Sequence, residues 1–257
     1  MWESALRQPK TSLLICLSLL SFRIGYSDNR IRRRDGRMTD QNTQNRTWYF
    51  VRHGETDWNA EKRMQGQWES NLNENGKGHA DVNGSWLATL PIEHIWASPQ
   101  VRVRQTAKII SKHVALAANP NFDDRLKEWS SGDWSGMLYA DIAKERPDEW
   151  AKWVEDRYNY RPPNGENFVD LEVRADSFFE DASKVTAETV AVLAHGFIIR
   201  VMVSRLAGLS QADVLAVKQT NDTVIRVRQS NGETIIDHFV GGIGPHAGLP
   251  LGEQGAA

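Results

Sequence analysis

From residue 47 onward, short apolar segments alternate with longer amphipathic ones, and this alternation limits the fold more than any other feature of the sequence. Segments 47–51, 94–98 and 189–196 are short and rich in β-branched or aromatic residues, which predicts strands. The segments between them carry apolar residues at helical spacing. Alternating strands and helices favour a mostly parallel sheet covered on both faces. We therefore predict an α/β fold, a three-layer sandwich whose central sheet is flanked by helices.

Several residues that start or break elements refine this prediction. We expect Ser98 to cap a helix and Pro147 to divide the helical stretch 139–158 in two. An Asn-Gly turn predicts a hairpin over 223–240. The predicted helices span 78–90, 98–114, 139–158, 166–185 and 197–208.

The first 46 residues stand apart from the alternating pattern. The apolar run 12–22 is too short to span a bilayer, which takes about 20 residues, and it is similar to the core of a signal peptide. The basic stretch 30–37 would be a poor start for an exported chain. Met38 opens a polar leader that runs into the first strand. We therefore expect Met38 to be the true start and 1–46 to be a disordered or wrongly assigned extension.

We assign residues 47–242 to one domain and expect the small-residue tail 243–257 to be flexible.

Charge and cysteine content narrow the class of protein to which this chain can belong. The formal net charge of −2 argues against a nucleic-acid binder, and we expect no stable membrane association. Cys16 is the one cysteine, so no internal disulfide can form and a reducing compartment is favoured. The expected location is the cytoplasm, unless residues 1–37 are a genuine signal sequence.

Basic side chains follow the ends of the predicted strands. Arg52 and His53 come directly after the first strand, and the segment 189–196 ends in His195-Gly196. In parallel α/β sheets, ligands bind beyond the carboxyl ends of the strands. Arg102 lies in the first turn of a predicted helix, whose N-terminus favours an anion. Arginine forks match phosphate oxygens in charge and geometry, so the sequence predicts a phosphate site.

Four motifs along the chain resemble those of the histidine phosphatase superfamily, also called the phosphoglycerate mutase-like family. They are VRHGETDWN (51–59), SPQVRVRQTA (98–107), LKEWSSGDWSG (126–136) and LAHGFIIR (193–200). The resemblance covers roughly residues 48–240. It implies an α/β sheet fold, a catalytic domain over 47–242 and chemistry through a phosphohistidine without a metal.

The resemblance also implies roles for the basic residues. His53 is the expected nucleophile, because a neutral imidazole nitrogen can attack phosphorus and hold the phosphoryl group. Arg52 and Arg102 are expected to neutralise the phosphoryl oxygens in the transition state. The family's arginine is the first of an R-x-R pair, so we choose Arg102 over Arg104. His195 is expected to donate a further hydrogen bond to these oxygens.

Acidic and polar residues complete the expected site. Glu128 is the expected proton donor to the leaving alcohol and later the base for water, with Asp133 and Glu149 as alternatives. Thr56 and Asn59 are expected to orient or contact the phosphate. A metal-dependent phosphatase would need clustered His and Asp ligands, and the sequence has none at a recognisable spacing. We therefore predict no metal site and no cofactor.

The motifs also bear on the reaction. Cofactor-dependent mutases of the family read E-R-x-Y-G and H-G-N-S-x-R where this chain has EWSSG (128–132) and HGFIIR (195–200). The stretch PPNGENFVDLEVR (162–174) is similar to the P-x-G-E-S stretch of the phosphatase branch and its later arginine. We therefore predict a metal-independent phosphomonoesterase. A phosphoglycerate mutase is the alternative, and an inactive phosphate-binding module is a third and less favoured one.

The substrate is expected to be a small phosphorylated metabolite, and the sequence leaves its identity and the oligomeric state open. Basic residues in the expected lid could bind a second anionic group, although most are expected on a solvated helix face: Lys144, Arg146, Lys152, Arg157 and Arg161. Tryptophans could instead shape an aromatic pocket: Trp129, Trp134, Trp150 and Trp153.

Overall fold

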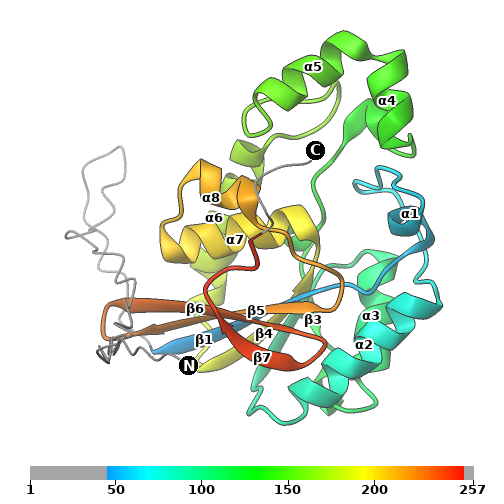
Figure 1. The fold of residues 1–257 in the computed structure, drawn as a ribbon. Helices are drawn as coiled ribbons and strands as arrows, with labels where there is room; N and C mark the ends of the chain where they lie inside the picture. The colour runs from blue at the N-terminus through cyan, green and yellow to red at the C-terminus, as the bar shows by residue number, and fades with distance from the viewer. Residues whose placement is uncertain (1–44, 252–257) are drawn as a thin grey trace, which may run out of the picture. The chain divides into compact units, whose positions relative to one another are not determined.

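Seven strands form one mixed sheet in the computed structural model, which describes residues 45–251 (Figure 1). Residues 1–44 and 252–257, with the expected start at Met38, lie outside the described residues. In spatial order the strands are β3 (Asn121–Phe122), β2 (His94–Ala97), β4 (Thr189–Ala194), β1 (Arg46–Arg52), β5 (Thr223–Ser230), β6 (Glu233–Val240) and β7 (Ile243–Ala247). The first four run parallel, whereas β5, β6 and β7 add antiparallel pairings. The predicted α/β fold is confirmed.

Helices cover the sheet on both faces (Figure 1). The helices are α1 (Asp57–Ala60), α2 (Glu74–Leu87), α3 (Val101–Ile110), α4 (Tyr139–Glu145), α5 (Pro147–Glu155), α6 (Phe168–Ala182), α7 (Gly196–Ala207) and α8 (Gln211–Ala216). Phe50 and Val192 point into the core beneath α6 and α7, whereas Val51 and Leu193 point into the core beneath α2 and α3. Such continuous apolar runs are typical of parallel strands buried on both faces.

Tryptophans from the segment containing α4 and α5 join the same core as Phe50 and Val192. Pro147 is the first residue of α5, so the predicted break is confirmed, and the fixed backbone of proline suits this position. The ring of Trp134 is fully buried, 6.4 Å from Trp150 and 6.0 Å from Trp153 between centroids. These three tryptophans pack on one another and lie outside the lining of the pocket described below.

The expectation of a flexible tail after residue 242 is wrong for its first part. Ile243–Ala247 form β7, which pairs with β6, and Leu251 bridges to Val217. The edge of β6 offers unpaired backbone groups that a further strand can bind. Gly241 and Gly242 adopt φ angles of 56° and 76°, which lets the chain turn back onto that edge.

The loop after β1 lies directly against the first turn of α2, because both contact points are glycines. A Cβ atom on Gly54 would lie 2.1 Å from the carbonyl oxygen of Gly76. A Cβ atom on Gly76 would lie 2.0 Å from the carbonyl oxygen of Glu55. Side chains do not fit at such distances, so this close approach fixes where the chain goes after β1.

We expect Gly76→Ala to lower the free energy of unfolding by about 1–3 kcal/mol, because the added methyl group pushes the loop away from α2. Gly78→Ala is the matched control in the same helix, where a Cβ atom would meet no atom of the described chain within 4 Å. Alanine there should stabilise the helix by up to about 1 kcal/mol. Urea unfolding measures both. Equal stability of the two variants would contradict the close approach.

Candidate active site

The carboxyl ends of β1 and β4 place two histidines side by side. Arg52 lies opposite Ala194 in the parallel register, and the backbone N–H of His53 donates to the carbonyl oxygen of Ala194 at 3.1 Å. His195 follows directly. The imidazole centroids of His53 and His195 are 5.1 Å apart with 61° between the ring planes, and both side chains are buried. The two predicted strand ends therefore meet at one point.

The hydrogen bond of His53 determines which ring nitrogen is free. Nδ1 lies 2.7 Å from the carbonyl oxygen of Gly54. A carbonyl oxygen can only accept, so Nδ1 carries the proton and Nε2 keeps its lone pair. Burial, and then the positive charges of Arg102 and Arg52, hold the pKa of His53 well below its ordinary value. At neutral pH the ring is therefore neutral, with a free lone pair on Nε2.

Arg102 is buried and is held by carbonyl oxygens rather than by a carboxylate. Its Nη1 and Nη2 donate to the carbonyl oxygens of Trp68 at 2.9 Å and Gly66 at 2.8 Å. Its charge stays available to a ligand, because carbonyl dipoles carry no net charge. Burial lowers the pKa of Arg102 to about 10, so it remains charged at neutral pH. Arg104, the alternative, is exposed and lies over the ring of Phe122 at 3.9 Å.

His195 uses both of its ring nitrogens. Nε of Arg102 donates to Nδ1 at 3.1 Å, so the proton is on Nε2, which donates to Oγ of Ser98 at 2.8 Å. Ser98 was predicted to cap a helix, and that prediction is wrong. The helix α3 begins three residues later, at Val101, with Gln100 at the N-cap position. Burial lowers the pKa of His195 well below its ordinary value, so this ring is also neutral.

Arg52 and Glu128 meet at the N-terminus of α7. The Glu128 carboxylate accepts hydrogen bonds from the backbone N–H groups of Phe197 at 3.2 Å and Ile198 at 3.3 Å. Such groups at a helix start favour a negative charge. The Arg52 guanidinium packs on Gly196, where a Cβ atom would lie 3.6 Å from Cζ. Burial lowers the pKa of Arg52, whereas the nearby Glu128 raises it.

The loop 125–130 is held in place by a pair of residues whose role the sequence analysis missed. Arg174 donates to two carbonyl oxygens of this loop, each at 2.8 Å, and pairs with Glu166 at 3.0 Å. Glu166 in turn accepts from the backbone N–H of Ser130 at 2.8 Å. Both residues lie in the stretch 162–174, whose pattern is similar to that of the phosphatase branch. That pattern alone does not indicate that the two residues hold the loop of Glu128.

The remaining predicted residues divide into those at the pocket and those away from it. Asn59 lines the pocket, whereas Thr56 is fully buried and caps α1, accepting from the backbone N–H of Asn59 at 3.1 Å. Glu128 lines the pocket as well. Asp133 accepts from Asn164 at 3.0 Å and Glu149 from Trp134 Nε1 at 2.8 Å, and both lie outside the lining.

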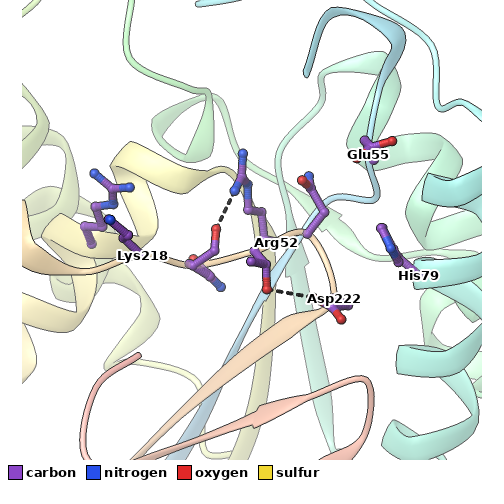
Figure 2. A pocket seen from close by; sticks show the side chains of 9 residues that line it. Arg52, Glu55, His79, Lys218 and Asp222 are labelled. Carbon is purple, nitrogen blue, oxygen red and sulfur yellow. Dashed lines mark hydrogen bonds between the residues drawn. The ribbon is translucent and has the colours of Figure 1, made fainter. Parts of the chain in front are cut away.

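The residues that line the pocket surround a small polar cavity of about 190 Å³. Its charged lining residues are Arg52, Arg63, Arg102, Arg157, Arg200 and Glu128. A second hollow of about 500 Å³ adjoins it and shares Arg52 and Arg200. Figure 2 shows Arg52 between Lys218 on one side and Glu55 and His79 on the other. Between residues 45 and 251, no three His, Cys, Asp or Glu side chains gather closely enough to hold a metal ion. In the same part of the chain, no helix has the length and apolar character needed to cross a membrane.

Comparisons with known proteins find matches over most of the chain. The profile of the histidine phosphatase superfamily (branch 1) matches residues 48–240. The chain is 33% identical over 181 residues to a probable phosphoglycerate mutase, GpmB, from Citrobacter koseri, covering 70% of this chain and 83% of the relative. It is 31% identical over 161 residues to phosphoserine phosphatase 1 from Hydrogenobacter thermophilus, covering 62% and 75%. A mycobacterial glucosyl-3-phosphoglycerate phosphatase superposes with a TM-score of 0.65 at 29% identity, covering 71% and 92%.

The buried neutral histidines predict a stability that falls in acid. Above the ordinary histidine pKa of about 6.5, His53 and His195 are neutral in the folded and unfolded chain alike. Below it, the unfolded chain binds protons that the folded chain does not. Each histidine then removes about 1.4 kcal/mol of unfolding free energy per pH unit. Urea unfolding between about pH 7.5 and 5 should show an unfolding free energy that falls as the pH falls. In His195→Gln this dependence on pH should be weaker by about 1.4 kcal/mol per pH unit, the equivalent of one proton. An unchanged slope would contradict the neutral assignment.

Proposed function

The chain belongs to the histidine phosphatase superfamily, branch 1, and on this premise we propose that it is a phosphomonoesterase that works without a metal through a phosphohistidine on His53. The observation that carries the proposal is the neutral ring of His53, with Nε2 free beside the charges of Arg52 and Arg102. The cavity of about 190 Å³ is smaller than the roughly 300–1,000 Å³ of typical ligand sites, which favours a small phosphorylated metabolite. The chain's one cysteine favours a cytoplasmic location.

The proposed reaction has two displacements. In the first, Nε2 of His53 forms a bond to phosphorus while the bond from phosphorus to the ester oxygen breaks. The leaving oxygen takes a proton from Glu128. In the second, a water oxygen attacks the phosphohistidine, Glu128 takes a proton from that water, and the N–P bond breaks to release inorganic phosphate. Arg52 and Arg102 neutralise the phosphoryl oxygens in both steps.

Glu128 gives its proton to the leaving oxygen in the first step and takes one from water in the second, so its carboxyl group is regenerated in each cycle. In the structure its carboxylate accepts hydrogen bonds from the start of α7. His195 can donate to a phosphoryl oxygen only by exchanging its bond to Ser98.

The aromatic wall of the pocket favours hydrolysis over the mutase reaction. Mutases of the family carry polar Arg and Asn at the positions of Trp129 and Phe197. In this chain the two rings stack, with centroids 5.1 Å apart and 22° between the planes. Polar groups that would hold a phosphoglycerate while it reorients are thus replaced by an apolar surface. The relatives named phosphoserine phosphatase 1 and glucosyl-3-phosphoglycerate phosphatase are consistent with hydrolysis, whereas the relative GpmB is named a probable mutase.

We expect His53→Ala to lower phosphate release by about 10⁴-fold or more while the protein still folds, because the nucleophile is lost. Phosphorus NMR of the full chain with a panel of phosphomonoesters and a chelator, including 3-phosphoglycerate with a trace of 2,3-bisphosphoglycerate, measures this. The exposed His113→Ala is the matched control and should keep full activity.

Three results would contradict the proposal. Phosphate release by His53→Ala at the wild-type rate would refute the nucleophile. Conversion of 3-phosphoglycerate to 2-phosphoglycerate without phosphate release would identify a mutase. Loss of wild-type activity in the chelator, with recovery on adding a divalent metal, would refute the metal-independent reaction.

A further inference from the structure

The pocket holds more positive charge than one phosphomonoester requires. Its lining contains five arginines and one carboxylate, Glu128. One of the five, Arg63, is already paired with Glu61 at 2.9 Å. Four arginines therefore face one carboxylate, which leaves a net charge of about +3 at neutral pH. A phosphomonoester brings about two negative charges, so at least one positive charge of the lining stays without a counter-charge within that lining. Glu55 and Glu69, outside it, act on Arg52 and Arg102 and not on Arg157.

Arg200 is one of the two arginines that the phosphoryl chemistry does not use. It lies on α7 four residues after Gly196, and therefore on the same helix face as Gly196, which also lines the pocket. Its guanidinium lies 5.3 Å from the ring of Phe197. Its Nε is buried and finds no hydrogen-bond partner within residues 45–251. Burial, together with the charge of Arg52, lowers the pKa of Arg200 to about 10.

Arg157 is the other, and it reaches the pocket from the segment that follows α5. Its Nε is likewise buried without a partner in the described chain, and its guanidinium lies 4.4 Å from the ring of Trp153. Of the five basic residues expected to bind a second anion, it is the one that lines the cavity. Arg146 pairs with Glu149 and Arg161 with Asp170, whereas the lysines are exposed.

Arg157 and Arg200 are half-buried, and a guanidinium group withdrawn from water without an ion-pair partner is costly, so a ligand that brings a negative charge offsets that cost. No ion pair within 4.0 Å joins Arg157 or Arg200 to a carboxylate between residues 45 and 251, although the charge of Glu128 is near enough to act on Arg200. Tyr139 lines the same cavity, and burial raises the pKa of its phenol, so its hydroxyl stays protonated and able to donate. Two guanidinium groups and a phenol are donors that suit an anion.

We propose that Arg157 and Arg200 bind a second anionic group, a carboxylate or a second phosphoryl group, on a phosphomonoester whose phosphoryl group faces His53. This inference rests on the proposed phosphatase function and names its substrate class: a small phosphate ester with a further acidic group. Tyr139 adds a hydrogen bond to that group. The exposed Lys218, which lines the adjoining hollow beside Arg200, lies outside this subsite.

The test compares kcat/KM of the full chain for three esters of similar size. Glycerol 3-phosphate has one anionic group, 3-phosphoglycerate adds a carboxylate, and glycerol 1,3-bisphosphate adds a phosphoryl group. We expect the wild type to prefer at least one doubly anionic ester by about tenfold or more, and the larger of the two ratios identifies the second group. Arg157→Gln and Arg200→Gln should each reduce that preference by about tenfold, mainly through KM. Lys218→Gln is the matched control and should leave the preference unchanged.

Three results would overturn the inference. They are equal kcat/KM values for all three esters in the wild type, an equal loss for all three in Arg157→Gln and Arg200→Gln, or loss of the preference in Lys218→Gln alone. If neither these three esters nor the wider panel of phosphomonoesters releases phosphate, the proposed function fails by itself. The second-anion site is then judged by calorimetric binding of the same three esters to the wild type and to Arg200→Gln. Tighter binding of a doubly anionic ester that Arg200→Gln abolishes supports it, and equal binding refutes it.

Discussion

The parallel pairing of β1 with β4 determines where Arg52, His53 and His195 lie. Because the backbone of His53 continues the ladder to Ala194, the residue after each strand reaches the same edge of the sheet. His53 and His195 then lie side by side, and α7 starts between Arg52 and Glu128. A slip of one residue in this pairing would turn alternate side chains to the opposite face and separate the histidines.

The site also depends on how its positive charges are held. The guanidinium groups of Arg102 and Arg52 are fixed by backbone carbonyl oxygens, those of Gly66 and Trp68 for the first and of Gln219 for the second. Carbonyl oxygens orient a cation without cancelling its charge, whereas a carboxylate would cancel it. Burial is the main cause of the neutral histidine rings, and the uncancelled charge of the two arginines adds to it. The charge that would bind a phosphate ester thus also helps to keep the proposed nucleophile neutral.

The sequence predicted the features that have local causes. The strand ends before His53 and His195 and the break at Pro147 follow from composition and turn chemistry over a few residues. Features that depend on packing between distant segments could not be predicted. The strand β7 forms because the edge of β6 is free to pair with it. Of the five basic residues expected in the lid, only the folded structure shows that Arg157 is the one that lines the cavity.

The central claim is that His53 is neutral, with its proton on Nδ1 and a lone pair on Nε2. Nitrogen NMR of the full chain with ¹⁵N-labelled histidine measures this directly at neutral pH, with His53→Gln used to assign the resonance. The hydrogen bond to the carbonyl oxygen of Gly54 predicts a protonated Nδ1 and a bare Nε2. A protonated Nε2, whether in the other tautomer or in an imidazolium ring, would contradict the account, because His53 would then have no lone pair to attack phosphorus from that nitrogen.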